Sequence, residues 1–161
     1  MRLANRADCS TSAYRAQSFH VEWALLMDRI SVERRSENMR RIRDKDTAPE
    51  MLVRRLVHNL GYRYRLHAKD LPGKPDLVFR GRKKAIFVHG CFWHFHSACR
   101  EGRIPGSRIE FWEAKLRRNQ ERDQRHLMAM SQLKWKVLVI WECEIGNTQK
   151  LKQRLQKFLS P

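Results

Sequence analysis

The feature that most constrains this chain is a short apolar segment that runs directly into a cluster of histidines, cysteines and aromatic residues. Residues 86–99 read IFVHGCFWHFHSAC. The start of this segment is typical of a buried strand, whereas imidazole and thiolate side chains bind transition metals and transfer protons near neutral pH. Neither a plain hydrophobic core nor a plain surface loop needs this mixture. The fold must therefore place the end of a buried strand beside a chemically reactive loop.

The chain carries a large excess of positive charge. Its 161 residues include 34 Lys and Arg against 17 Asp and Glu, which gives a formal net charge of +17. Such a charge favours a polyanionic partner through counterion release, and nucleic acid is the leading candidate. Composition alone leaves open a ribosome-like structural protein, a protein that binds anionic membranes, and charge that only maintains solubility.

Length and cysteine usage indicate the number of domains and the redox compartment of the protein. A chain of 161 residues is long enough for one domain with a sizeable core. Its four cysteines are too few and too unevenly spaced for a disulfide framework, which favours a reducing compartment. No apolar run approaches the ~20 residues of a membrane span. We expect a cytoplasmic, nucleoid-associated monomer with no membrane partner.

The chain divides into three predicted segments. Residues 1–30 lack sustained hydrophobic periodicity and predict a flexible N-terminal extension. Residues 31–46 are rich in Arg and Lys and predict a basic arm that contacts phosphates. Residues 47–161 predict the folded domain.

Within the folded domain, hydrophobic periodicity predicts the order helix, three strands, helix, strand, helix. A capping box at Thr47 and Glu50 opens the first helix, and Gly61 ends it. The later strand is almost continuously apolar, as expected for a strand covered on both faces. The predicted ranges are 47–61 for the first helix, 62–67, 76–79 and 84–88 for the three strands, 107–133 for the second helix, 136–141 for the later strand and 147–159 for the last helix. The strands at 76–79 and 84–88 form a predicted hairpin.

The long helix predicted at 107–133 has two distinct faces. One face is cationic and carries Lys115, Arg118, Arg122 and Arg125. The other is an apolar stripe that contains Asn119 and Asp123, where polar groups are costly unless they meet a partner. We therefore expect Asp123 to have a partner inside the protein.

Three residues are candidates for metal binding or proton transfer. The predicted hairpin brings Asp76 beside His89, where a carboxylate can hold a divalent metal; a turn-capping aspartate is the alternative. Glu50 occupies the capping-box position after Thr47, a role that is compatible with binding metal-bound water. His94 lies in a loop that leaves the sheet and is either a general base or an ordinary loop histidine.

A second candidate site involves thiols. Cys91, His96 and Cys99 lie in one loop, and Cys143 follows the predicted strand at 136–141. Three thiolates and one imidazole suit tetrahedral zinc, but the spacing matches no common finger pattern, so free buried thiols remain the alternative. Cys9 is left over and is expected to be free.

Aromatic residues flank these candidates. Phe92 and Trp93 follow Cys91, and Trp112 opens the long helix. Aromatic residues usually belong to the core, but in a strongly basic protein exposed ones can wedge between base pairs.

Several motifs together resemble the very short patch repair (Vsr) DNA mismatch endonucleases. The resemblance spans about residues 31 to 145, with the motifs in the same order. The motifs are SENMRRIRDKDTAPE at 36–50, LPGKPD at 71–76, IFVHGCFWH at 86–94, FW at 111–112, NQERD at 119–123 and VIWEC at 139–143.

The resemblance implies an α/β fold of the restriction-endonuclease type, in which helices flank a mixed sheet and a structural zinc is present. Residues 47–161 would then be the endonuclease domain, and the arm at 31–46 would contact DNA. The implied activity is Mg²⁺-dependent nicking of duplex DNA on the 5′ side of thymine in a T:G mismatch that arises when 5-methylcytosine deaminates, which initiates very short patch repair. Mismatch repair proteins are possible partners by the same resemblance.

The resemblance also implies roles for individual residues. Asp76 and the backbone carbonyl of Val88 would bind Mg²⁺, while Glu50 and His89 would orient metal-bound waters. His94 would be the general base, with Asp123 holding its ring. The zinc ligands would be Cys91, His96, Cys99 and Cys143. The DNA-intercalating residues would be Phe92, Trp93, Trp112 and Met39.

Two departures from related patterns accompany the resemblance. The related nucleases usually carry an acid and a lysine on the second strand, where this chain has Val88 and Gly90. Two residues separate His96 from Cys99, where many relatives have one. The alternatives to a T:G nickase are a related nickase of altered base specificity and a non-catalytic, zinc-bound DNA-binding module.

Overall fold

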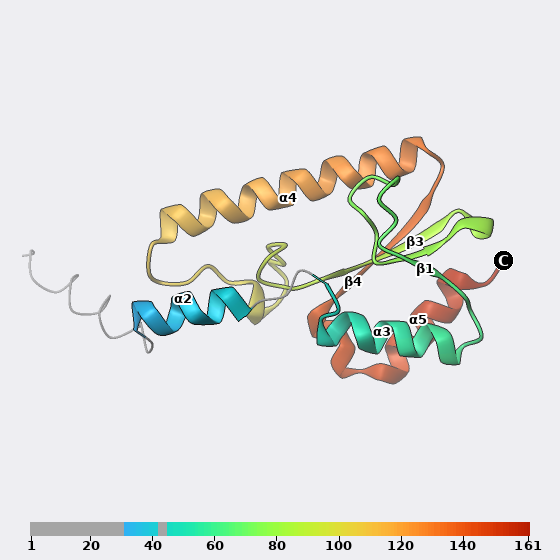
Figure 1. Cartoon of the computed structure of the whole chain (residues 1–161), viewed down its shortest axis with the longest axis horizontal. Coiled ribbons are helices and arrows are strands. Elements are labelled where there is room, and N and C mark those ends of the chain that lie inside the picture. Colours follow the sequence, from blue (N-terminus) through green and yellow to red (C-terminus); the bar gives the residue numbers. More distant parts are fainter. Residues whose placement is uncertain (1–30, 42–44) are drawn as a thin grey trace, which may run out of the picture.

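The computed structural model describes residues 31–41 and 45–161, and it contains one four-stranded mixed sheet flanked by helices (Figure 1). Strands β1, β2 and β3 pair antiparallel, and β4 pairs parallel to β3. The strand order is therefore β1-β2-β3-β4. The strands are β1 (Arg65–Leu66), β2 (Leu77–Phe79), β3 (Lys84–His89) and β4 (Lys136–Trp141). This arrangement confirms the predicted mixed α/β fold class.

Helices cover the two faces of this sheet. Helix α4 lies on one side, and α3 and α5 lie together on the other (Figure 1). The helices are α2 (Val32–Arg41), α3 (Ala48–Asn59), α4 (Ile109–Gln132) and α5 (Thr148–Leu159), with short 3-10 turns η1 (Arg80–Arg82), η2 (Arg100–Gly102) and η3 (Glu142–Gly146). Among the described residues, no helix combines the length and the apolar character that crossing a bilayer requires.

The start of α3 follows the predicted capping pattern with one difference. The Glu50 N–H donates to Thr47 Oγ1 at 3.4 Å, as expected for an N-cap threonine. The Glu50 carboxylate accepts from the Asp46 N–H at 2.8 Å, one residue earlier than a capping box requires. Gly61 follows the helix with φ +85, a conformation that glycine adopts without a steric penalty.

The sheet separates two hydrophobic clusters. Because side chains alternate along a strand, Leu77 and Ile86 face α3 and α5, whereas Val78 and Ala85 face the other side. The larger cluster is completed by residues of both helices, and the smaller one includes Met130 of α4. Strands β2 and β3 are thus buried on both faces, which makes them a rigid platform for residues at their ends.

Two predictions about strands need correction. The strand at 136–141 was expected to be covered on both faces, but in β4 only Ile140 is buried. The reason is that β4 lies at the edge of the described sheet, and a continuous apolar run does not distinguish an edge from a centre. The strand predicted at 62–67 shortens to Arg65–Leu66, because it pairs only with Val78 and Leu77.

The N-terminal predictions are described only in part. Residues 1–30 lie outside the described part of the chain, so the predicted extension stays a prediction. Within the basic arm, Val32–Arg41 form helix α2. Met39 belongs to this helix, but its side chain lies outside the described part of the structure, and its proposed wedge role stays a prediction.

The burial of α5 predicts how much this helix contributes to stability. Leu155 is fully buried against the sheet and α3, so Leu155→Ala should lower the free energy of unfolding by about 2 to 5 kcal/mol. Urea denaturation followed by circular dichroism measures this change. The same substitution at the exposed Leu133 should change the free energy by less than about 0.5 kcal/mol. Equal effects of the two substitutions would contradict this packing.

Candidate active site and metal centre

A cavity of about 390 Å³ lies between the ends of the strands and helix α4. Five residues that were predicted for metal binding or proton transfer line it: Asp76, Val88, His89, His94 and Asp123. Glu50 is buried and does not line the cavity. The fold therefore gathers side chains from two strand ends, one loop and one helix into a single polar space.

Asp76 precedes β2 and is held across the hairpin by β3. The Val88 N–H donates to Asp76 Oδ2 at 2.7 Å. The carboxylate therefore binds the backbone of the neighbouring strand β3 and does not cap the turn that precedes β2. Burial raises the pKa of Asp76 to about 6; the hydrogen bond from Val88 opposes this rise, and the negative charge of Glu50 adds to it. A largely buried carboxylate whose charge is poorly compensated is a suitable ligand for a divalent cation.

His94 and Asp123 form a hydrogen-bonded pair across the cavity wall. His94 Nδ1 lies 2.5 Å from Asp123 Oδ2. Burial alone would raise the pKa of Asp123, but the hydrogen bond and the charge interaction with His94 outweigh it and leave the pKa lowered. A carboxylate on Nδ1 fixes the tautomer in which Nε2 of the imidazole can accept a proton. The expectation that Asp123 has an internal partner is confirmed, and Asn119 likewise donates to the Trp93 carbonyl at 3.0 Å.

His89 packs flat against His94. The two ring centroids are 3.7 Å apart and the rings are inclined by 6°. Burial lowers the pKa of His89 to about 3, and positive charge on His94 acts in the same direction. His89 is therefore uncharged at neutral pH. The indole of Trp141 contacts its ring edge-on at a centroid distance of 5.3 Å, which fixes the orientation of the stacked pair.

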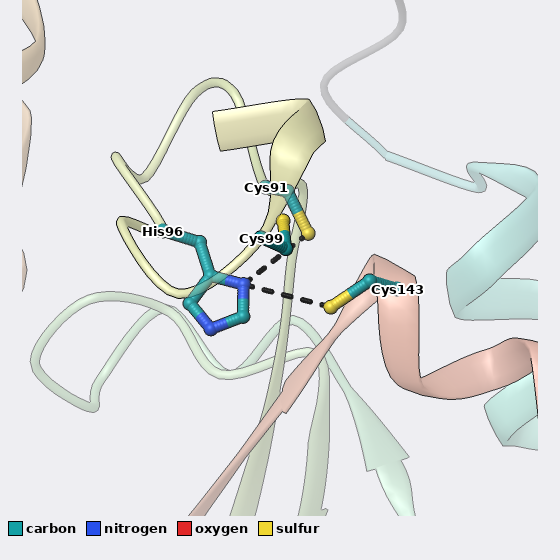
Figure 2. A group of neighbouring side chains, drawn as sticks. All are labelled: Cys91, His96, Cys99 and Cys143. Atoms are coloured by element: carbon teal, nitrogen blue, oxygen red, sulfur yellow. Dashed lines mark hydrogen bonds between the residues drawn. The ribbon is translucent and has the colours of Figure 1, made fainter. Parts of the chain in front are cut away.

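The four predicted zinc ligands come together at one point. Figure 2 shows three of them in the loop after β3 and Cys143 in the turn after β4. One ligand atom from each of Cys91, His96, Cys99 and Cys143 lies within 4.8 Å of all the others. The Cys91 and Cys143 Sγ atoms lie 3.6 and 3.5 Å from Nδ1 of His96 (Figure 2). A sulfur and a nitrogen ligand of tetrahedral zinc are separated by about 3.6 Å, so this donor set is consistent with a structural zinc site.

The local backbone explains why the unusual spacing between His96 and Cys99 is tolerated. The Cys99 N–H donates to the His96 carbonyl at 3.3 Å, so the extra residue is absorbed in a turn. A Cβ atom on Gly102 would lie 2.0 Å from the same carbonyl oxygen, so only glycine fits there. Trp141 stacks on the His96 ring at a centroid distance of 4.2 Å and an angle of 5°. Burial raises the pKa of Cys91 to about 12, so metal binding there must displace a proton.

The aromatic residues form one cluster at the start of α4. Phe92, Trp93 and Trp112 meet edge to face, with centroid distances between 5.0 and 6.2 Å. Trp112 is only 9% exposed, whereas the neighbouring Phe111 is 45% exposed. The ammonium of Lys115 lies over the rings of Trp93, Phe111 and Trp112. Intercalation by the three predicted residues stays a prediction, and Trp112 would need to leave its packed position to take part.

Known proteins resemble this chain over most of its length. Residues 27–100 match the family model described as DNA mismatch endonuclease Vsr. The chain is 48% identical over 136 residues to type II nicking enzyme V.XorIIP of Xanthomonas oryzae pv. oryzae, covering 84% of this chain and 99% of the relative. It is 42% identical over 117 residues to DNA mismatch endonuclease Vsr of Escherichia coli, covering 73% and 74%. It is 40% identical over 134 residues to type II nicking enzyme V.NmeAIP of Neisseria meningitidis, covering 83% and 95%.

The chain belongs to the Vsr family. It is therefore a DNA nicking endonuclease, which disfavours the alternative of a non-catalytic binding module.

Sequence reasoning missed several residues of this Vsr-family site. His67 lines the cavity, and Arg54 is buried in contact with both His67 and Glu50. A signal for His67 was present, because antiparallel pairing of the predicted strands at 62–67 and 76–79 places it opposite Asp76. The lining also contains Lys45 of the predicted basic arm and Arg122 of the predicted cationic face, together with Lys69 and Lys74, to which sequence reasoning gave no role.

The thiol cluster predicts one bound zinc per chain of this Vsr-family protein. Cys143→Ser removes one of the four ligands and should lower both the zinc content and the melting temperature, because metal binding contributes to folding. A loss of about 2 kcal/mol corresponds to about 4 to 8 °C for a domain of this size. Elemental analysis and thermal unfolding measure the two quantities. Cys9→Ser is the matched control and should leave both unchanged; zinc-free parent protein would contradict the assignment.

Proposed function

We propose that this protein hydrolyses one strand of duplex DNA in the cavity, with Mg²⁺ held by Asp76 and the backbone carbonyl of Val88. The observation that carries this proposal is that the His94–Asp123 pair and the Asp76 carboxylate line the same cavity. A carboxylate and a carbonyl are hard oxygen donors of the kind that Mg²⁺ prefers, so the residues fit the ion. When bound, Mg²⁺ supplies Lewis-acid stabilisation of the charge that develops on the phosphate and on the leaving 3′-oxygen.

In the proposed reaction, His94 acts as the general base. Its Nε2 accepts a proton from the attacking water, whose oxygen forms a bond to phosphorus in line with the bond to the 3′-oxygen. That second bond breaks, and the departing 3′-oxygen takes a proton from solvent, which leaves a 3′-hydroxyl and a 5′-phosphate. Asp123 supports the step because its carboxylate stabilises the positive charge that forms on the imidazole. We infer that His89 orients water in the same site. Glu50 does not line the cavity and pairs with Arg54, so its implied role in orienting water stays a prediction.

The charge around the cavity supports a nucleic-acid substrate. Lys45, Lys69 and Lys74 are exposed side chains of its lining, and Arg122 borders it from α4. Acidic and imidazole groups thus lie inside a rim of cations. Such a rim attracts the phosphates of DNA and makes binding strongly dependent on salt.

Two base preferences are candidates for the nicking activity. The motif resemblance implies a T:G mismatch, cut on the 5′ side of thymine to initiate repair of deaminated 5-methylcytosine, with mismatch repair proteins as possible partners. A nickase of altered base specificity is the second candidate. It is favoured by the relatives V.XorIIP and V.NmeAIP, which are named type II nicking enzymes, the first of them at higher identity than the E. coli enzyme.

The mechanism predicts the effect of two substitutions. Asp76→Asn should abolish detectable nicking, and His94→Ala should lower the nicking rate by about 10² to 10⁴-fold, because loss of a general base has effects of this size. Both variants should bind duplex DNA with an affinity close to that of the parent. Single-turnover cleavage of an end-labelled duplex, together with a binding titration, measures both properties.

Matched controls for these variants lie on the protein surface. Asp70 and His58 are exposed residues outside the cavity lining, so Asp70→Asn and His58→Ala should nick at the parental rate. Parental rates in Asp76→Asn or His94→Ala would remove the corresponding residue from the mechanism.

The base preference is tested with duplexes that differ at a single pair. T:G, T:A and C:G duplexes in one sequence context, with the label on either strand, should show a break only beside the thymine of the T:G pair if the mismatch preference holds. A break at matched pairs with a comparable rate would instead establish the second candidate. Omission of Mg²⁺ should abolish either reaction.

A further inference from the structure

His67 occupies an unusual backbone position beside the candidate metal ligand. It follows β1 directly and has φ +44, a left-handed conformation that costs a residue with a Cβ roughly 1 kcal/mol or more. Its N–H donates to the Asp76 carbonyl at 3.5 Å, and its ring lines the cavity with Nδ1 at 4.0 Å from Asp76 Oδ1. A strained turn is thus maintained at the point that brings this imidazole to Asp76.

Arg54 determines which nitrogen of His67 carries the proton. Its Nη2 atom lies 2.9 Å from His67 Nε2, and its guanidinium also pairs with Glu50 and Asp46. An arginine has donors only, and its Nη2 atom is closer to Nε2 of His67 than the Glu50 Oε1 atom, which lies at 3.5 Å, so Nε2 accepts in the shorter contact. In the neutral imidazole the proton is then on Nδ1, the nitrogen that faces Asp76.

The same guanidinium argues against a metal site formed by Asp46, Glu50 and His67. Ligand atoms of Asp46, Glu50 and His67 lie close enough together to suggest a second cation site. However, the buried side chain of Arg54 contacts all three residues and already supplies a positive charge among them. The guanidinium offsets one of the two carboxylate charges and already contacts the ligand atoms of all three residues, so the group is a support held by an arginine and not a site for an additional metal.

We propose that His67 is a positioning residue for Asp76, whose Nδ1–H, set by Arg54, orients the Asp76 carboxylate for divalent-cation binding. The Val88 N–H holds Oδ2 from one side, and His67 faces Oδ1 from the other. The 4.0 Å separation is longer than a hydrogen bond, and such contacts tighten when substrate binds. This inference rests on the proposed function only for the premise that Asp76 binds the cation.

Two substitutions separate positioning from folding. Asn keeps a donor near the position of Nδ1 and tolerates left-handed backbone, whereas Gly removes the ring but adopts φ +44 without strain. Both variants should therefore fold, which circular dichroism checks. His58→Gly repeats the second substitution at an exposed site and is the control.

Binding of Mn²⁺ to the zinc-loaded protein without DNA is the primary measurement, with electron paramagnetic resonance reporting free Mn²⁺. Asp76→Asn defines the Asp76-dependent component of this binding. We expect His67→Gly to raise the Kd of that component by about 10 to 100-fold, as for other residues that orient metal ligands. His67→Asn should recover most of the affinity, and His58→Gly should match the parent.

Nicking assays supply the second measurement. His67→Gly should raise the Mg²⁺ concentration needed for half-maximal rate by a similar factor, with little change in the KM for DNA. Parental Mn²⁺ affinity in His67→Gly, or equal losses in His67→Gly and His67→Asn, would overturn the inference and leave the proposed function intact. If the parent nicked no duplex while Mn²⁺ binding still depended on His67, the proposed function would fail and the inference would hold.

Discussion

The pairing of β3 with neighbours on both sides is the constraint on which the rest of the molecule depends. Its antiparallel partner β2 places Asp76 where the Val88 N–H can reach it, and its parallel partner β4 places Trp141 opposite His89. The chain leaves β3 at its carboxyl end and forms the loop that carries His94 and the first three thiol-cluster residues. One strand end therefore positions both the cavity and the candidate zinc centre. Its burial on both faces of the sheet gives these side chains a rigid base.

Local sequence pattern predicted the parts of this arrangement that depend on neighbouring residues. The hairpin between 76–79 and 84–88 follows from a turn between two apolar runs, and it explains why Asp76 could be placed beside the end of β3. The need of Asp123 for a partner followed from its place on an apolar stripe, although the stripe did not identify His94. The four thiol-cluster residues were chosen by ligand chemistry, which does not depend on knowing the loop path.

The parts that were missed depend on tertiary geometry. Arg54 reaches His67 only because α3 packs against the sheet near the end of β1, and no spacing in the sequence encodes that distance. Strand pairing could have placed His67 opposite Asp76, but pattern analysis does not detect the left-handed conformation of His67 itself. The exposure of β4 was mispredicted for a related reason, because the position of a strand within a sheet is a property of the whole fold.

The placement of Trp141 has a consequence that extends beyond either site. One face of its indole stacks on His96 in the thiol cluster, while its ring contacts His89 in the cavity. The Trp141 side chain therefore contacts both the thiol cluster and the cavity. Movement of the thiol loop would shift Trp141 and, through it, the stacked rings of His89 and His94. A structural zinc ion would thus influence the alignment of the histidines in the cavity without taking part in the reaction.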